Sequence, residues 1–249
     1  MLTTKLVSAL VVLGLIASLS SAAIIADYTD PTDSYTIAEV IQAKGIIVGD
    51  KLFDEFRVTD SNSQFAVAPG AGAIKVTGIL VGGDYGLRFN GPWSATAGQL
   101  ADSTIAFRVS IIEPDLSEGW LIKDNALWIT AFGVSNTVQG GIVSVSEQVY
   151  ASDPAAGFTE PIANKAVYYV DDTNKWLYDE KDFVDASGAP LELPEVWVIK
   201  DVIANGGYGE TGIAHLSEFY QTFSQIPEPG AMALLGLGGL AMLIRRRRG

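Results

Sequence analysis

The chain offers few side chains for nucleophilic or acid–base chemistry. It has one histidine, His215, and no cysteine. A histidine-based triad, general acid–base scheme or zinc site would have to use His215, and the lack of cysteine excludes thiolate sites and disulfides. His215 lies in the stretch Ile213-Ala-His-Leu-Ser-Glu-Phe219, with neither a nucleophile elbow nor a second metal ligand at suitable spacing. We therefore expect a structural or surface histidine and no catalytic residue of this kind.

Asp171-Asp172-Thr173-Asn174 places several oxygen ligands close together. Such spacing is typical of a calcium-binding turn, with Asp171, Asp172 and Asn174 as the ligands. The stretch lacks the glycine and the downstream glutamate of an EF-hand loop. The same residues are typical of an Asx-type hairpin turn that needs no cofactor, and this is the interpretation that we favour. Both interpretations remain open from the sequence.

Carboxylates and aromatic rings suggest chemistry on sugars. A glycoside hydrolase needs two carboxylates about 5–10 Å apart, but 29 acidic residues guarantee such pairs by chance and identify none. Aromatic rings in strands more often serve the core, although exposed ones stack on sugars. The candidates for a stacking platform are Trp93, Trp120, Trp128, Trp176, Trp197 and the pair Tyr168–Tyr169. Trp93 follows Asn90-Gly-Pro, where we expect a loop that does not force burial. No ladder of regularly spaced Thr or Ala residues indicates ice binding.

The elements that would position these side chains are short strands. Runs rich in Val, Ile, Phe, Tyr, Trp and Thr are broken by Gly, Pro, Asn and Asp. The expected strands are 51–58, 63–68, 73–81, 85–90, 103–112, 126–132, 141–150, 166–171, 175–179, 194–203 and 211–224, and one short helix is expected at 36–44. Long amphipathic helices between strands are missing, which argues against βαβ units. We expect an all-β fold, an antiparallel jelly-roll-like β-sandwich of about ten strands.

The N-terminus has the pattern of a secretory signal. Lys5 is the only charged side chain before Asp27, residues 6–19 form an apolar run, and Ser20-Ser-Ala-Ala23 supplies small residues for cleavage. We expect a signal peptide over 1–23, cleaved after Ala22 or Ala23, and therefore an exported protein.

The charge balance excludes one class of partner. The chain has a net charge of −13, and without Lys5 and the four terminal arginines 11 basic residues stand against 29 acidic ones. Such a surface repels phosphate backbones, so we expect no nucleic-acid binding. It favours solubility and could attract divalent cations.

The C-terminal stretch has three parts in fixed order. Pro227-Glu228-Pro229 is a stiff, extended handle, because proline fixes φ and lacks an N–H. Residues 231–244 are uncharged and, as a transmembrane helix, would be about 21 Å long. That is short for a hydrocarbon core of about 30 Å. Four arginines follow, Arg245, Arg246, Arg247 and Arg248, and would stay on the cytoplasmic side of the inner membrane.

This tail resembles the PEP-CTERM sorting signal of Gram-negative bacteria, which also circulates under the name of an ice-binding protein C-terminal domain. The resemblance implies recognition by an exosortase, a membrane-embedded cysteine protease. That enzyme would cut near Pro227-Glu228-Pro229 and release the protein or transfer it to the cell surface, alongside exopolysaccharide. An ordinary C-terminal membrane anchor is the alternative.

The central domain also resembles a recurrent β-sandwich found ahead of PEP-CTERM tails. The stretches that carry this resemblance are 49–53, 86–91, 198–203 and 215–225. It brings no known activity, and it implies one domain whose last strand runs into the sorting signal. The expected organisation is a signal peptide at 1–23, a lead-in at 24–44, the β-sandwich at 45–225 and the sorting signal at 226–249.

Two functions follow for the exported domain. The first is a non-catalytic role at the cell surface or in the extracellular matrix, with polysaccharide or calcium as ligand. The second is a secreted glycan-active hydrolase that uses a carboxylate pair. A filled sandwich with shallow faces favours the first, and a cleft with converging carboxylates of perturbed pKa favours the second.

Overall fold

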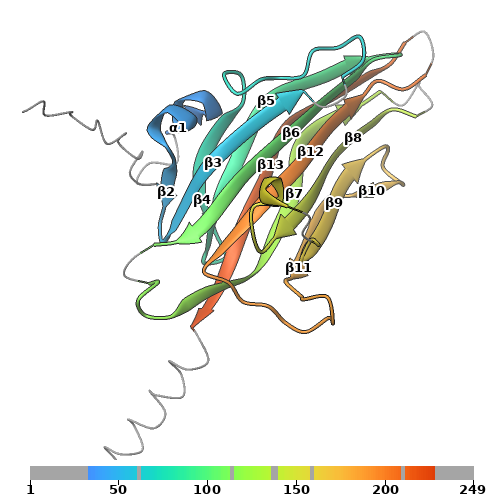
Figure 1. The fold of residues 1–249 in the computed structure, drawn as a ribbon. Helices are drawn as coiled ribbons and strands as arrows, with labels where there is room; N and C mark the ends of the chain where they lie inside the picture. The colour runs from blue at the N-terminus through green and yellow to red at the C-terminus, as the bar shows by residue number, and fades with distance from the viewer. Residues whose placement is uncertain are drawn as a thin grey trace, which may run out of the picture.

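Two antiparallel sheets form the fold (Figure 1). The computed structural model describes residues 33–60, 63–112, 115–135, 140–157, 160–208 and 211–227. The six-stranded sheet, here the β13 sheet, has the order β1 (Tyr35–Thr36), β4 (Lys75–Val81), β5 (Asp84–Thr96), β13 (Ile213–Pro227), β7 (Trp120–Val134), β11 (Tyr178–Asp182). The seven-stranded sheet, here the β12 sheet, has the order β10 (Lys175–Trp176), β9 (Ala163–Tyr169), β8 (Ile142–Tyr150), β12 (Glu195–Asn205), β6 (Leu100–Ile111), β3 (Lys51–Asp60), β2 (Ile46–Val48).

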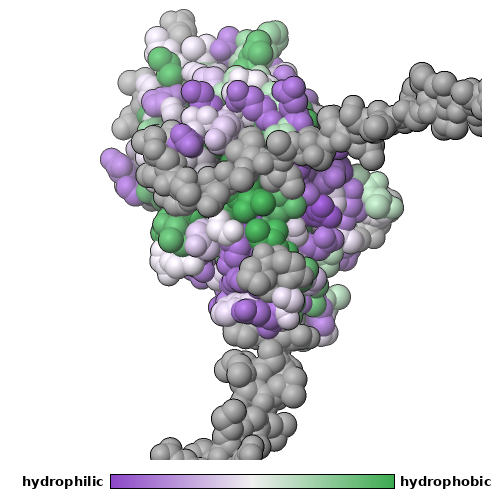
Figure 2. All heavy atoms as spheres, turned by 90° about the vertical axis from the view of Figure 1, so that its left-hand side faces the viewer, coloured by the Kyte–Doolittle hydropathy of each residue, from purple (hydrophilic) through white to green (hydrophobic). Residues whose placement is uncertain are grey.

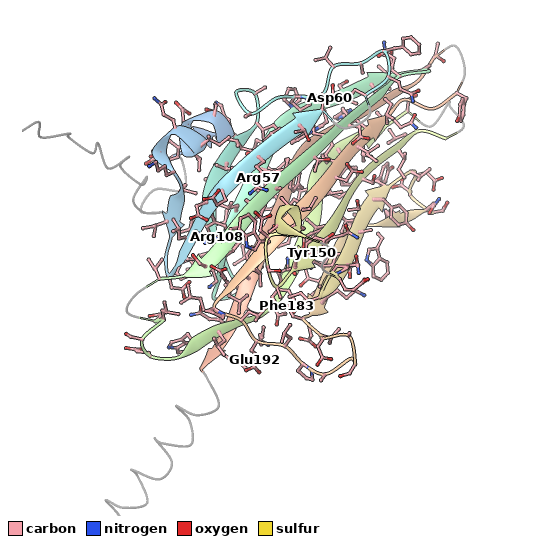
Figure 3. The ribbon with its side chains drawn as sticks, viewed as in Figure 1. Arg57, Asp60, Arg108, Tyr150, Phe183 and Glu192 are labelled. Carbon is pink, nitrogen blue, oxygen red and sulfur yellow. The ribbon has the colours of Figure 1, made fainter. Side chains whose placement is uncertain are left out.

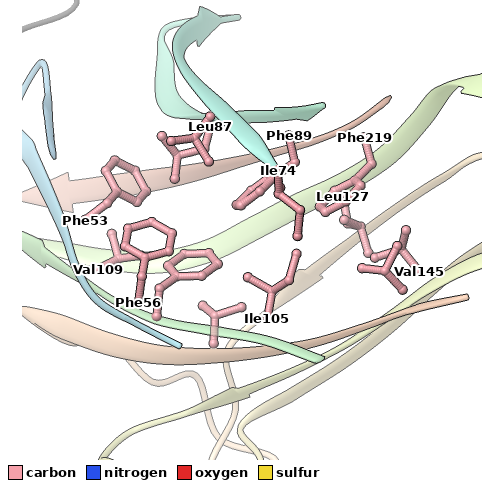
Figure 4. Close-up of a cluster of buried hydrophobic side chains, with 14 of the residues drawn as sticks. Phe53, Phe56, Ile74, Leu87, Phe89, Ile105, Val109, Leu127, Val145 and Phe219 are labelled. Carbon is pink, nitrogen blue, oxygen red and sulfur yellow. The ribbon is translucent and has the colours of Figure 1, made fainter. Parts of the chain in front are cut away.

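The core lies between the inner faces of the two sheets. Alternation along the strands produces it: Ile105, Phe107 and Val109 of β6 are buried, while the residues between them face outward and are only half-buried. Phe89 of β5 stacks on Phe219 of β13 with ring centroids 4.7 Å apart and an interplanar angle of 11°. Figure 4 shows these rings packed against side chains from the β12 sheet. The expected all-β sandwich is confirmed.

A short helix covers one end of the sandwich. Helix α1 (Ile37–Ala43) begins with a capping box, in which Thr36 and Glu39 exchange side-chain and backbone hydrogen bonds. Its Ile37 and Val40 are fully buried and belong to the same core as the strands. Strand β1, just before it, pairs with β4. The 3-10 turn η1 (Pro154–Ala156) is the other helical element in the described residues.

Two of the expected strands are wrong. Residues 63–68 are no strand: only bridges at Gln64 and Phe65 form there, and Phe65 is 89% exposed. The expected strand 175–179 is split, because β10 pairs with β9 and β11 pairs with β7 of the other sheet. An apolar segment forms a strand only where a neighbouring strand is available to pair with it. That neighbour is set by the tertiary structure and cannot be identified from the segment's own composition.

The stretch around Trp93 was expected to be a loop and is part of β5 instead. The strand continues through Pro92 to Thr96, with Trp93 paired to Leu216 of β13. The indole is fully buried and donates from Nε1 to Ser103 Oγ at 3.0 Å. Pro92 is exposed and is not among the residues of β5 that pair with β13, because the ladder shifts register there. The bulge therefore accommodates a proline inside a central strand.

One side of the molecule is mainly hydrophilic. Figure 2 shows one side on which polar residues dominate around a small apolar area. This distribution fits the acidic composition, and it leaves the apolar side chains mostly to the core.

Replacing Trp93 by Phe tests the buried indole. We expect the Trp93→Phe variant to lose about 2 kcal/mol of unfolding free energy, since the change removes a buried hydrogen bond and leaves a small void. The matched control is Trp176→Phe, because Trp176 is 55% exposed, and there the loss should stay within about 0.5 kcal/mol. Urea unfolding followed by circular dichroism measures both. Equal losses in the two variants would contradict the assignment of Trp93 to the core.

Candidate functional site: an aromatic pocket on the β13 sheet

The outer face of the β13 sheet carries three cross-strand rows of side chains. Each row consists of residues that pair across neighbouring strands, so their side chains point to the same face of the sheet. Successive rows are two residues apart along each strand, which is about 7 Å. The aromatic row is Arg88, Tyr220, Trp128 and Tyr178; the small row is Gly86, Thr222, Ala126 and Glu180; the carboxylate row is Ser224, Asp124 and Asp182. The ladder register therefore assembles the site.

The aromatic row forms a platform of rings. Trp128 stacks on Tyr220 with centroids 5.1 Å apart and an interplanar angle of 6°, and Tyr178 lies 6.2 Å from Trp128 on the other side. Tyr178 is 51% exposed, and Trp128 and Tyr220 are half-buried. Because these rings face outward, they are available to a ligand in a way that core rings are not.

Three members of the small row, Thr222, Ala126 and Glu180, line a pocket of about 540 Å³ beside these rings. Its lining residues are Val81, Gly82, Asp84, Asp124, Ala126, Trp128, Ile129, Leu177, Tyr178, Glu180 and Thr222. Gly86 allows β5 and β13 to approach closely, since a Cβ there would lie 1.9 Å from the backbone oxygen of Gln221. A pocket with an aromatic wall and a few convergent polar groups is the usual form of a small-ligand site.

Hydrogen bonds fix the two tyrosines of the platform. Tyr178 donates to Glu180, and this bond, together with burial, raises the pKa of Tyr178 to about 12. Glu218 accepts from Tyr220 at 2.6 Å, Thr130 at 2.7 Å and Asn90 at 2.9 Å. Burial acts to raise the pKa of Glu218, but these donors together lower it. Both phenols are neutral at physiological pH, and the rings are held in place.

The carboxylate row and Asp84 make the opposite wall acidic. Asp124 accepts from Ser224 and lies 3.0 Å from the ammonium of Lys123. Burial and the nearby charge of Asp124 raise the pKa of Asp84. The pocket therefore offers hydrogen-bond acceptors at neutral pH and repels anions.

The other tryptophans named from the sequence have different environments. Trp197 is 9% exposed and lies beneath two guanidinium groups, at 5.3 Å from Arg57 and 5.8 Å from Arg108. Arg57 pairs with Asp153 at 3.0 Å, and Arg108 pairs with Asp54 at 2.7 Å. Figure 3 shows both arginines on the outer face of the β12 sheet. These ion pairs cover Trp197, so it is no stacking platform.

The remaining candidates divide between packing and surface. Trp120 is partly buried against the core, and Tyr169 contacts Phe132 at 4.7 Å. Trp176 is exposed on the two-residue strand β10, at the edge of the β12 sheet. Of the tryptophans proposed for stacking, Trp128 is the one that lines the pocket.

Sequence reasoning missed most of the pocket. Tyr178, Tyr220, Asp84 and Asp124 were not singled out. The alternation of 218, 220 and 222 in β13 was readable, and it places Glu218, Tyr220 and Thr222 on one face. The pairing of β11 with β7 could not be predicted from the sequence. The two segments are about 50 residues apart in the chain, and neither sequence pattern indicates the other as its partner.

His215 has a packing role. Its side chain lies on β13 opposite Gly133 of β7, and a Cβ at Gly133 would come within 2.5 Å of the imidazole. The imidazole therefore fills the space that the glycine leaves on the sheet surface. No hydrogen bond from His215 to a nucleophile is found within the described residues.

Asp171 caps a hairpin turn between β9 and β10. Its Oδ1 accepts from the backbone N–H of Thr173 at 2.7 Å, from the Thr173 hydroxyl at 2.6 Å and from the backbone N–H of Asn174 at 2.8 Å. These hydrogen bonds lower the pKa of Asp171. Asp172 contacts Lys175 at 3.3 Å. The contacts are those of an Asx turn, and calcium binding by Asp171, Asp172 and Asn174 stays a prediction.

The sorting residues lie at and beyond the last strand. Pro227 is the last residue of β13 and is paired with Trp120. Glu228, Pro229, residues 231–244 and the arginines 245–248 lie outside the described residues, as does the expected signal peptide. Within the described ranges, no helix has the length and apolar character needed to cross a membrane.

Residues 225–248 match the model of the PEP-CTERM protein-sorting motif. The chain carries a PEP-CTERM sorting signal. The motif marks an exported protein that is sorted to the cell surface by way of an exosortase, as expected from the tail. It is a sorting signal, and no enzyme family is indicated by it.

No curated protein matches the chain. Among solved structures, a mannohexaose complex of CBM27-1 from Caldicellulosiruptor saccharolyticus is similar at 10% identity, covering 61% of this chain and 81% of that one, with a TM-score of 0.31. The mannan-recognising module TmCBM27 matches at 11% identity over 76% and 95%, with a TM-score of 0.26. A family 11 carbohydrate-binding module of Clostridium thermocellum matches at 11% over 66% and 86%, with a TM-score of 0.21. Scores this low do not bear on what the chain binds.

A second acidic group lies on the β12 sheet. Asp102 of β6 is 5% exposed, and burial, followed by the hydrogen bond and charge of Asp201 on β12, raises the pKa of Asp102 to about 7. Because an unfolded aspartate titrates near about 3.9, the folded chain binds more protons than the unfolded chain between roughly pH 4 and 7. Protonation of Asp102 therefore adds to the free energy of unfolding. This addition is complete below about pH 4 and is lost as the pH rises through 7.

Replacing Asp102 by Asn tests this pair. The amide resembles the protonated acid, so we expect Asp102→Asn to be more stable than the wild type at pH 8 by about 1–2 kcal/mol, allowing for solvent screening. At pH 4 the two should agree within about 0.5 kcal/mol. Urea unfolding at both pH values measures this, with Asp33→Asn at an exposed position as control. A constant difference between variant and wild type across the pH range would refute the linkage.

Proposed function

We propose that the protein is a non-catalytic polysaccharide-binding protein of the cell surface or extracellular matrix. The observation that carries the proposal is the outward-facing platform of Trp128, Tyr220 and Tyr178 beside a pocket with acidic and hydroxyl groups. Aromatic faces stack on the apolar faces of sugar rings, and carboxylates accept hydrogen bonds from sugar hydroxyls.

The negative charge of the pocket favours a neutral polysaccharide over an anionic one. Asp124 and Glu180 line the pocket, and the chain as a whole is strongly acidic. Anionic polymers would meet like charges in a partly desolvated site, which is unfavourable. Neutral hydroxyl-rich chains meet fixed acceptors and rings that need little reordering on binding.

We infer that the tail acts through the residues named from the sequence. Pro227, Glu228 and Pro229 form the handle for the exosortase, residues 231–244 hold the chain in the inner membrane before processing, and Arg245 to Arg248 stop it on the cytoplasmic side. Support comes from the matched motif and from the position of Pro227 at the end of β13, where the handle leaves the sheet.

A hydrolase that uses the same pocket is the second candidate. Its support is the raised pKa of Asp84 near the carboxylate of Asp124, since a general acid needs a raised pKa. Incubating the protein with each polysaccharide it binds and measuring new reducing ends separates the two functions. Release of reducing ends that Asp84→Asn abolishes would establish the hydrolase, and stable binding without release supports the binding role.

Removing the central ring of the platform tests the binding site. We expect Trp128→Ala to weaken binding to neutral glucan, mannan or xylan by about tenfold or more, because a stacked ring contributes about 1–2 kcal/mol. Affinity electrophoresis of protein recovered from the cell surface measures this. Trp176→Ala is the control, since Trp176 is more exposed to solvent than Trp128 but lies on the other sheet. If the two variants bind the neutral polysaccharides with the same affinity, the platform is not the binding site. Alginate, an anionic polysaccharide, serves as the comparison for charge.

Changing the handle tests the sorting assignment. We expect a chain in which Pro227, Glu228 and Pro229 are all alanine to accumulate with its C-terminus intact in the inner-membrane fraction. The wild type should reach the surface with a trimmed C-terminus, because the exosortase reads the handle. Mass spectrometry of the C-terminal peptide from fractionated cells measures both. A chain without residues 227–249 should stop in the periplasm; delivery of either variant to the surface would rule out the handle.

A further inference from the structure

The core contains a group of charged side chains between the sheets. Glu147 of β8, Lys165 of β9 and Lys200 of β12 come from the β12 sheet, and Asn125 of β7 comes from the β13 sheet. The side chains of the three charged residues are completely shielded from solvent, and Asn125 is fully buried. All four occupy inward positions of their strands, among apolar neighbours such as Val145, Val167 and Val198.

Glu147 is the centre of this group. Its Oε1 lies 2.9 Å from the ammonium nitrogen of Lys165 and accepts from Asn125 Nδ2 at 2.6 Å, while its Oε2 accepts from Lys200. Lys165 Nζ also donates to Asn125 Oδ1. One carboxylate oxygen therefore contacts both the lysine nitrogen and the nitrogen of the asparagine amide. The lysine nitrogen, in turn, contacts the amide group itself.

Two ammonium groups share one carboxylate in this buried site. With both lysines charged the cluster carries one surplus positive charge, which is costly away from water. Burial opposes ionisation of Glu147, but Lys165 and Lys200 together lower its pKa to about 2. Burial lowers the pKa of Lys200 to about 8. A reaction that removes one ammonium charge from this place would relieve the imbalance.

We propose that Lys165 and Asn125 form an intramolecular amide bond between their side chains, with Glu147 as the catalytic proton carrier. The inference is independent of the proposed ligand and of the sorting signal. It concerns a covalent modification that the folded chain makes by itself, without a cofactor or a second enzyme.

The reaction balances without any external reagent. Glu147 takes a proton from the Lys165 ammonium, and the free electron pair of Nζ attacks Cγ of Asn125. The π electrons of the Cγ–Oδ1 bond move onto Oδ1 as Nζ adds to Cγ. When they re-form the carbonyl, the Cγ–Nδ2 bond breaks. Nδ2 leaves with both protons that Nζ loses, the first delivered through Glu147. The products are a secondary amide and one ammonium ion, and the surplus charge departs with that ion.

The surroundings favour this chemistry. The reacting groups are held in contact on three rigid strands, so the reaction needs no encounter step. Lys200 stays beside Glu147 and keeps a neutral ion pair in place after the reaction, with its ammonium 5.7 Å from the Phe219 ring and 6.0 Å from the Phe89 ring. Exclusion of water protects the amide from hydrolysis.

The bond would join the two sheets covalently. Asn125 and Lys165 are 40 residues apart in the chain, and their strands β7 and β9 belong to different sheets. Closing a loop of this length removes many unfolded conformations, as a disulfide does. A protein without cysteine has no disulfide to do this.

Tryptic mapping of the purified full chain, digested in denaturant, tests the bond. Lysine and arginine are missing between Lys123 and Lys165, so an unlinked chain yields peptides 124–165 and 166–175. A linked Lys165 resists trypsin, and we expect instead one peptide, 124–175, lighter by about 17 Da through loss of ammonia. Further cleavage after Glu147 should release 124–147 joined to 148–175, because the Glu160–Pro161 bond resists cleavage. Cleavage at exposed Lys175 serves as the internal control.

Two variants distinguish the proposed bond from other losses of ammonia. Asn125→Ala should give the free peptide 124–165 and melt about 10 °C lower than wild type. Asn125→Asp should give the same linked product as wild type, by loss of water. The tryptic map of the wild type tests the bond by itself, even if Asn125→Ala does not fold. Recovery of 124–165 with free Lys165 from folded wild type overturns the proposal, and so does a mass loss in 124–147 without attachment to 148–175.

Discussion

Burial of one face of each sheet against the other holds this protein together. An exported domain without cysteine depends on that contact, and its centre is aromatic: the stacked pair Phe89–Phe219 reaches Phe107 of the opposite sheet at 5.8 Å from Phe89. Each buried phenyl ring stabilises the fold by about 2–3 kcal/mol through removal of apolar area from water. Alternation along the strands then assigns the other set of side chains to solvent, so the core and the outer faces follow from one pattern.

The same alternation explains why the two outer faces differ. On the β12 sheet, Trp197 is covered by Arg57 and Arg108, each of which is neutralised by an aspartate. On the β13 sheet, Trp128 has tyrosines as neighbours and no cation above it among the contacts of the described residues. Equivalent tryptophans on equivalent surfaces thus differ in accessibility because of what the adjacent strand presents. The cross-strand neighbour decides whether a ring packs or remains available.

Much of the architecture was predictable from the sequence, and the pocket was not. Runs such as Thr104 to Ile111 alternate so regularly that strand and facing follow directly, and the terminal motif was readable because its three parts are contiguous. Trp93 was misplaced because Gly-Pro ahead of it is typical of a loop, whereas a bulge in the β13 pairing accommodates it. Lys165 and Lys200 look like surface residues in isolation. Their burial depends on Glu147, to which nothing in local sequence links them.

The pocket required knowledge of which strands are neighbours. Asp84, Asp124, Tyr178 and Tyr220 come from four strands, and each residue taken alone is an ordinary member of a half-exposed strand. Pairing between strands far apart in sequence is a property of the whole fold, and the period-2 pattern of one strand says nothing about its partner.

The position of β13 has a consequence for the order of events during export. This strand is the last of the described elements, yet it lies in the interior of its sheet between β5 and β7. Neither neighbour can complete its ladder until the C-terminal segment has emerged from the translocon, so the sandwich cannot close while its own tail is still in transit. The matched sorting motif begins at residue 225, inside that same strand, so the end of β13 and the start of the motif share residues 225–227.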